Sequence, residues 1–175
     1  YRTAELEFAL KKVGCRALVT ESSFKTSDYV AMLNELAPEL ASSEPGQLHS
    51  ARLPDLRIVI RLGDERSSGM FNFDDVAAKA GPQDFRALET IGSNLAIDAP
   101  INIQFTSGTT GSPKAATLTH HNLVNNASMS ATNMKFTERD RLCMPVPMYH
   151  CFGMVLGPLL CTSSGAAIVL PAAAF

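Results

Sequence analysis

Apolar and polar positions along the chain follow two periods in turn, one typical of helices and one typical of strands. An early helix face has apolar residues three or four positions apart, at Leu6, Ala9, Leu10 and Val13. Gly14 is a natural helix end, and the apolar run Cys15–Thr20 predicts a strand. The chain therefore begins with a helix followed by a strand.

The middle of the chain repeats this order. A second helix face is marked by Tyr29, Leu33, Leu36 and Leu40, and Pro38 ends the helix nearby. A polar connector leads to the β-branched run Leu56–Leu62, which predicts a strand. After a loop, two short helices are expected over 73–81 and 82–92, the second beginning at Pro82.

The last third shows the same alternation around an unusual loop. We expect a strand at Ile101–Phe105, a Gly-rich loop, a helix from about Thr119 to Met134, a strand over 141–147, and a final helix and strand. Helices that alternate with strands predict an α/β fold, with a mostly parallel sheet and flanking helices.

The end of the chain carries no charged residue from Pro145 onwards. The run from Cys151 to Leu170 has about the length of a membrane span. However, Gly157-Pro158 and the polar stretch 162–165 divide it into a short helix and a short strand. The pattern favours elements buried in a larger domain and no membrane span.

Composition narrows the class of protein. Hydrophobic residues make up 46% and charged residues 18% of the 175 residues, which is typical of a globular chain. The net charge of −2 gives no reason to expect nucleic acid as a partner. The four cysteines lack CxxC spacing, so we expect reduced, buried thiols, with two disulfides as the alternative.

The Gly-rich loop carries the candidate chemistry. A strand, then glycines, then a helix exposes several backbone N–H groups at one point. Hydroxyls and one lysine add to them, so the loop predicts an anion cradle suited to a polyphosphate. Its residues are Thr106, Ser107, Gly108, Thr109, Thr110, Gly111, Ser112, Pro113 and Lys114.

Two common phosphate motifs do not fit this loop. The Walker A pattern needs a glycine where Pro113 stands and a hydroxyl where Ala115 stands, which argues against a P-loop hydrolase or kinase. The dinucleotide fingerprint fails because Gly108 and Gly111 have no third partner. On composition alone, a mobile linker is the alternative to a phosphate cradle.

The string from Phe105 to Asn126, "FTSGTTGSPKAATLTHHNLVNN", resembles the phosphate loop of the adenylate-forming (AMP-binding) enzymes. These include acyl-CoA synthetases, firefly-type luciferases and peptide-synthetase adenylation domains. The segment "PVPMYHCFG", 145–153, is similar to the family's next aromatic–His stretch, and "YRTAELEFALKKVGCRALV" to its helix–strand unit. Within the family the likeness is greatest to mitochondrial medium-chain acyl-CoA synthetases.

This resemblance implies a function and a site. It implies that a fatty acid and ATP form an acyl-adenylate and pyrophosphate, and that coenzyme A then yields the thioester, with Mg²⁺ present, in mitochondria. Thr106 to Lys114 would hold the β- and γ-phosphates, and Lys114 would offset charge on the departing pyrophosphate. His150 would lie beside the acyl pocket; the alternative for His150 is a core histidine that donates to a carbonyl.

The resemblance also implies that 1–175 is part of a large N-terminal domain, truncated at both ends, without the C-terminal domain. The piece alone is expected to be inactive. Another adenylate-forming enzyme and a non-catalytic ATP-binding module remain alternatives. The hint for the module is Ala115, where the family has glycine: alanine there would cost about 1–2 kcal/mol if the backbone had φ > 0.

Other reactive residues give weaker patterns. Cys151 beside His150 could be a thiol nucleophile, but no orienting carboxylate is apparent. His120 and His121 diverge by about 100° on a helix, so a shared metal ion is improbable, and no metal ligand is assigned.

Overall fold

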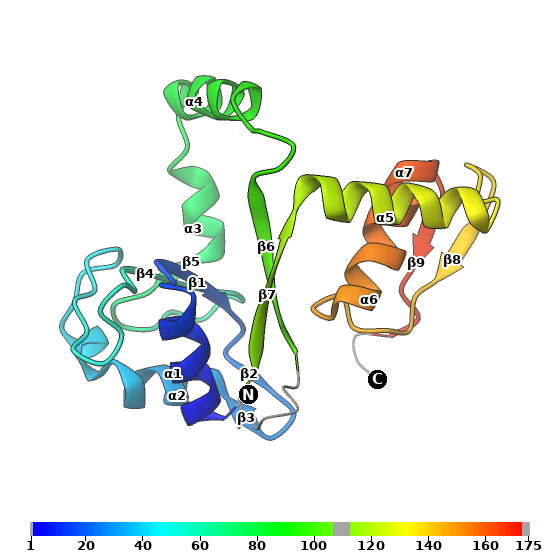
Figure 1. Ribbon diagram of the computed structural model, residues 1–175. Coiled ribbons are helices and arrows are strands. Elements are labelled where there is room, and N and C mark those ends of the chain that lie inside the picture. Colours follow the sequence, from blue (N-terminus) through cyan, green and yellow to red (C-terminus); the bar gives the residue numbers. More distant parts are fainter. Residues whose placement is uncertain (1, 107–112, 173–175) are drawn as a thin grey trace. The chain divides into compact units, whose positions relative to one another are not determined.

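The computed structural model describes residues 2–106 and 113–172 and divides into two compact units, Tyr1–Ser93 and Asn94–Phe175 (Figure 1). Each unit has its own helices, strands and apolar clusters. The units are therefore described separately.

The first unit is built on a three-stranded parallel sheet with the order β1-β4-β5. Its elements are α1 (Thr3–Lys12), β1 (Ala17–Thr20), β2 (Ser23–Phe24), β3 (Ser27–Asp28), α2 (Tyr29–Leu36), a 3-10 turn (Pro38–Ala41), β4 (Ile58–Arg61), β5 (Phe71–Asn72), α3 (Phe73–Ala78) and α4 (Pro82–Ser93). The predicted helices and the two long strands are confirmed. The strand pairs β2–β3 and β4–β5 were not predicted, because two-residue strands leave no periodic pattern.

Leucines form the core of the first unit. Leu33, Leu36, Leu40 and Leu48 are fully buried, and Leu10 of α1 joins the same cluster. Helix α2 therefore contributes its apolar face as the sequence predicted, while Pro38 converts the chain after Leu36 into the 3-10 turn that carries Leu40. Burying a leucine side chain stabilises a fold by roughly 1.5–3 kcal/mol.

An ion-pair network joins α1 to the connector before β4. The Glu7 carboxylate accepts from Arg52 Nη2 at 2.6 Å and from Lys11 Nζ at 2.9 Å. These two cations, Arg52 above all, lower the pKa of Glu7 to about 2. The pair Lys11–Glu7 lies within α1, whereas Arg52 is 45 residues away in sequence, so the network holds the connector against the helix.

The second unit combines an antiparallel hairpin with a helical layer and a parallel strand pair. Its elements are β6 (Pro100–Thr106), β7 (Lys114–Thr119), α5 (His120–Asn133), β8 (Arg141–Cys143), α6 (Cys151–Met154), a π-helical segment (Val155–Leu159), α7 (Leu160–Ser164) and β9 (Ala167–Val169). Strands β8 and β9 are parallel, and β6 and β7 are antiparallel. The α/β class is confirmed, and the chain contains antiparallel strand pairs in addition to the parallel ones.

The uncharged C-terminal run forms one continuous helical stretch from Cys151 to Ser164, followed by β9. The helix-then-strand prediction is therefore confirmed. Pro158 lies in the π-helical segment, where the wider turn accommodates the residue that lacks an N–H. Within the described ranges, no helix has both the length and the apolar character needed to cross a bilayer. The predicted strand over 141–147 is shorter than expected, since it ends at Cys143.

All four cysteines are free thiols. Cys161 is buried, Cys15 is partly buried, and burial raises the pKa of both thiols. Cys143 and Cys151 are exposed, so the prediction of buried thiols was wrong for these two.

Candidate active site

The predicted phosphate loop connects the two strands of a hairpin. Strands β6 and β7 form this hairpin (Figure 1), and in their register Thr106 pairs directly with Lys114. The loop was expected to lead from a strand into a helix, and this was wrong: β7 follows it, and α5 begins only at His120. Ser107, Gly108, Thr109, Thr110, Gly111 and Ser112 lie outside the described residues.

The pairing register decides which face of the hairpin carries each side chain. Directly opposed residues project to the same face, and successive residues alternate. Thr106 and Lys114 therefore share a face with Gln104 and Asn102 of β6 and with Leu118 of β7. Leu118 packs against the apolar cluster of α5 and the following helical run, so this face is the one turned toward the helices.

Lys114 is exposed and makes no ion pair with any residue that the structure describes. Thr106 and Pro113 are exposed beside it. An exposed ammonium group beside a hydroxyl, at the mouth of a loop, has the charge and the donors that a phosphate group requires. Of the nine predicted loop residues, the described structure thus brings together these three.

The conformation of Ala115 answers the question raised by the sequence. Ala115 lies in strand β7 opposite Phe105, and the described non-glycine residues with positive φ are Lys25 and Lys135. An extended backbone accommodates alanine without strain. The substitution of the family's glycine therefore imposes no backbone penalty here.

His150 caps the helix α6. Its Nδ1 accepts a hydrogen bond from the Phe152 backbone N–H at 3.2 Å, and its side chain is exposed. An accepting Nδ1 places the proton of the neutral ring on Nε2. Among the described residues His150 is thus exposed and does not donate from Nδ1 to a carbonyl, which leaves the Nε2–H available as a donor. Cys151 Sγ lies 3.8 Å from the same Nδ1.

The turn before His150 is packed tightly against Gly153. The His150 N–H donates to the Pro147 carbonyl at 3.1 Å, which closes the turn. A Cβ on Gly153 would lie 2.8 Å from the Pro147 carbonyl carbon and closer still to its oxygen. Gly153 is therefore the residue that allows α6 to approach the turn that presents His150.

The start of α5 is a capping box. The Thr119 hydroxyl accepts from the Asn122 N–H at 3.2 Å, and Asn122 Oδ1 accepts from the Thr119 N–H at 3.0 Å. His120 and His121 occupy the first turn, as predicted, and His121 Nδ1 lies 3.4 Å from Asp98. Across the described ranges, no three His, Cys, Asp or Glu side chains gather at a point where they could hold a metal.

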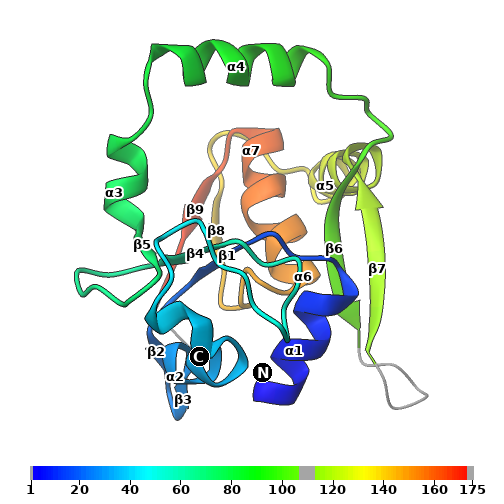
Figure 2. The same ribbon diagram turned by 90° about the vertical axis from the view of Figure 1, so that its left-hand side faces the viewer.

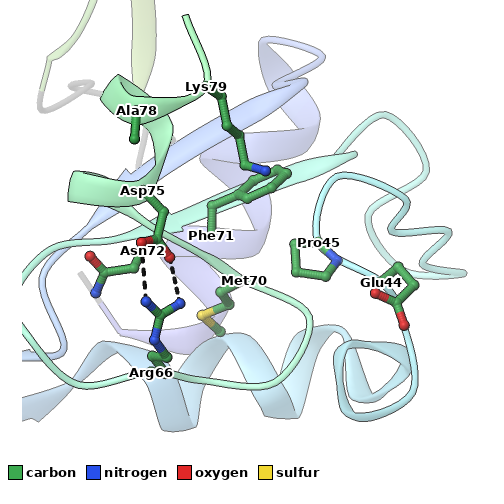
Figure 3. A pocket seen from close by; sticks show the side chains of 9 residues that line it. All are labelled: Glu44, Pro45, Arg66, Met70, Phe71, Asn72, Asp75, Ala78 and Lys79. Carbon is green, nitrogen blue, oxygen red and sulfur yellow. Dashed lines mark hydrogen bonds and ion pairs between the residues drawn. The ribbon is translucent and has the colours of Figure 1, made fainter.

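An open pocket lies in the first unit, away from the predicted site residues in sequence. It has a volume of about 570 Å³ and is lined by Met70, Phe71 and the paired side chains of Arg66 and Asp75 (Figure 3). Lys79 lies over the Phe71 ring at 5.4 Å. Arg66 is thus paired with Asp75, and Lys79 lies over an aromatic ring.

The hairpin loop, the aromatic–His turn and the fold agree with one class of protein. The sequence profile of the family described as "AMP-binding enzyme" matches residues 1–174, so the chain belongs to the AMP-binding enzyme family. Among its relatives is the mitochondrial medium-chain acyl-CoA ligase ACSF2. The zebrafish (Danio rerio) protein is 43% identical over the whole of this chain, and the human protein is 44% identical, also over the whole chain. The chain spans 29% of the length of each of these relatives.

Solved structures show the same fold. The anthranilate CoA ligase AuaEII, in complex with anthranoyl-AMP, matches 99% of this chain with a TM-score of 0.75 and 18% identity. ATP-bound MatB from Rhodopseudomonas palustris matches 100% of this chain with a TM-score of 0.66 and 26% identity. In each case the match covers 29% of the solved chain.

The sequence reasoning missed the polar side chains on the face of β6. Asn102 and Gln104 are partly buried, and Gln104 Nε2 donates to Asn102 Oδ1 at 3.0 Å. The signal was present: Asn is depleted in strands, yet Asn102 stands between two isoleucines. A polar residue in such a place indicates a partner outside the strand.

Proposed function

We propose that the protein to which this chain belongs is an ATP-dependent acid–thiol ligase. It joins a fatty acid to ATP, releases pyrophosphate, and transfers the acyl group from the acyl-adenylate to coenzyme A. The observation that carries the proposal is the cross-strand pair Thr106–Lys114 at the root of the predicted phosphate loop. Membership of the AMP-binding enzyme family and the identity to acyl-CoA ligases support it.

In this proposal the loop from Thr106 to Lys114 holds the β- and γ-phosphates. Backbone N–H groups and hydroxyls donate to the phosphate oxygens, and Lys114 offsets the charge that develops on the leaving pyrophosphate. Electrostatic stabilisation of this kind increases as charge develops in the transition state. Because Lys114 starts a strand, its backbone is held by the pairing with Thr106 before ATP arrives.

His150 serves the carboxylate in this proposal. Its Nδ1 is engaged by the Phe152 N–H, which leaves Nε2–H to donate to a substrate oxygen. A donor aimed at one carboxylate oxygen orients the other toward the α-phosphate. The exposed position of His150 at the start of α6 supports this role.

Mg²⁺ would add positive charge at the phosphates. Since the described residues hold no group of three metal-ligating side chains, we assign Mg²⁺ no ligand in this chain. Mg²⁺ usually binds through substrate phosphates and one or two carboxylates, so ATP itself would supply part of its coordination.

The substrate class and location come from the named relatives. ACSF2 proteins are medium-chain acyl-CoA ligases of mitochondria, and we propose medium-chain fatty acids and a mitochondrial location for the present protein. The alternative of a non-catalytic ATP-binding module has lost its support, because Ala115 lies unstrained in β7.

Replacing Lys114 by alanine in the intact enzyme tests the proposal. We expect carboxylate-dependent pyrophosphate release to fall about 100-fold or more, since one electrostatic contact of this kind contributes 10²–10³ in rate. Octanoate and a panel of shorter and longer acids serve as substrates, and pyrophosphate is measured directly.

Lys12→Ala is the matched control, because Lys12 is an exposed lysine at the end of α1. It should leave the rate unchanged. Pyrophosphate release at the wild-type rate by the Lys114→Ala enzyme would show that the loop does not hold ATP as proposed.

A further inference from the structure

A chain of polar contacts leads from the hairpin to the helix that begins after His150. Gln104 Nε2 donates to Asn102 Oδ1 at 3.0 Å, and Asn102 Nδ2 lies 3.8 Å from Met154 Sδ. Because the Asn102 oxygen is occupied by Gln104, its NH₂ group is turned toward the sulfur. The three side chains thus connect β6 to α6.

Met154 belongs to the same helical turn as His150. The Met154 N–H donates to the His150 carbonyl at 2.9 Å. The distance along the helix between these residues is about 6 Å. A side chain that fixes Met154 therefore also limits where the capping turn with His150 lies.

The same face of the hairpin leads to Lys114. Asn102, Gln104 and Thr106 alternate along β6, and Lys114 is the cross-strand partner of Thr106. From Asn102 to Thr106 the strand rises about 13 Å. Figure 2 shows the hairpin beside the helical run, with α6 nearer than α7 to the loop end of the hairpin, as in Figure 1.

The contact between Asn102 Nδ2 and Met154 Sδ contributes little to the stability of the fold. A thioether is a weak acceptor, and an amide in a strand is less favourable than a β-branched or aromatic residue. Leu118 and Met154 already pack against the apolar cluster around Leu123 and Val155. A leucine at position 102 would suit this packing, so the polar amide points to a directional role.

We propose that Asn102, oriented by Gln104, is a positioning residue that sets the helix α6, and with it His150, relative to Lys114 at the start of β7. The inference rests on the proposed function, in which Lys114 serves ATP and His150 serves the carboxylate. The geometry of the two substrates then depends on the link between β6 and α6.

Kinetics of the intact enzyme provide the first test. In Asn102→Leu we expect KM for octanoate to rise about tenfold, while KM for ATP stays within about twofold, because the loop root is untouched. Met154→Leu keeps an apolar side chain and removes the sulfur. It should likewise raise KM for octanoate and leave KM for ATP nearly unchanged. The double variant should be no worse than either single variant, since both remove the same contact.

A second readout does not depend on activity. Cys151 follows His150 directly and is exposed, as is Cys143 on β8. In Asn102→Leu and Met154→Leu we expect alkylation of Cys151 by iodoacetamide to rise several-fold relative to that of Cys143, as resolved by mass spectrometry. Asn126→Leu, which makes the same change at an exposed position of α5, should leave both measurements unchanged.

The outcomes are distinguishable. Equal effects on both KM values, or additive effects in the double variant, would overturn the positioning role. A wild-type enzyme that forms no acyl-adenylate would overturn the proposed function instead, and the alkylation ratio would then decide whether the link exists. An unchanged ratio in both variants would exclude it.

Discussion

At the scale of single residues, strand pairing rather than loop composition decides where Lys114 points. Its backbone is paired with Thr106, and its side chain lies on the face of β6 that carries Asn102 and Gln104. The sequence predicts the residue types of the site from their chemistry, and this assignment stays a prediction. It could not predict the face, because a face depends on a register that is set by the partner strand.

Ala115 gives a prediction at this scale. Ala115→Gly restores the residue that the family usually has, yet we expect no gain in activity. Glycine in a strand interior loses more backbone entropy than alanine, so the free energy of unfolding of the intact enzyme should fall by about 0.5–1 kcal/mol. Urea unfolding and pyrophosphate release measure the two quantities. A rate increase of several-fold would mean that Ala115 is strained after all.

At the scale of elements, helices and long strands were predictable and β7 was not. Periodic apolar faces identified α1 and α2, because such faces are local in sequence. The segment of β7, "KAATLT", contains two alanines and little alternation of apolar with polar residues, and it becomes a strand through pairing with β6. Thr119 as the cap of α5 was the available signal, since the residues before a cap are extended.

The approach of α6 to the turn before it gives a prediction at this scale. In Gly153→Ala the new Cβ would collide with the Pro147 carbonyl, so the turn that presents His150 must shift. We expect KM for the carboxylate to rise at least tenfold, with a smaller change for ATP. Steady-state kinetics with each substrate varied in turn measures this.

Gly92→Ala is the control for that variant. Gly92 lies in α4, and a Cβ there would meet no atom within 4 Å. Alanine should stabilise the helix by about 0.5–1 kcal/mol and leave both KM values unchanged. If Gly153→Ala behaved in the same way as Gly92→Ala, the close approach of α6 would be unimportant for catalysis.

At the scale of the whole molecule, the chain belongs to the AMP-binding enzyme family. It spans 29% of the human and zebrafish relatives. Apolar side chains are open to solvent on α4, where Phe85, Leu88 and Ile91 are 63%, 64% and 59% exposed. The parallel-sheet unit and the hairpin unit each have a core, but neither core includes these side chains.

The isolated 175-residue chain gives the last prediction. We expect it to form no acyl-adenylate from octanoate and ATP, and to bind a hydrophobic dye more strongly than the intact enzyme does, because exposed apolar surface attracts such dyes. Leu88→Gln in the isolated chain should reduce dye fluorescence. Measurable adenylate formation by the isolated chain would contradict the first expectation. Dye fluorescence of Leu88→Gln equal to that of the unchanged isolated chain would contradict the second.

The pairing of Thr106 with Lys114 also bears on insertions and deletions. Residues added between these two positions would lengthen the connection while Thr106 and Lys114 stay paired, and the ammonium group would keep its direction. One residue added just after Lys114 would instead move Lys114 one position along the strand relative to β6. Because successive side chains alternate, the ammonium group would then project from the opposite face of the hairpin. An insertion before this lysine therefore keeps its side chain on the same face of the hairpin, whereas an insertion after it reverses the face.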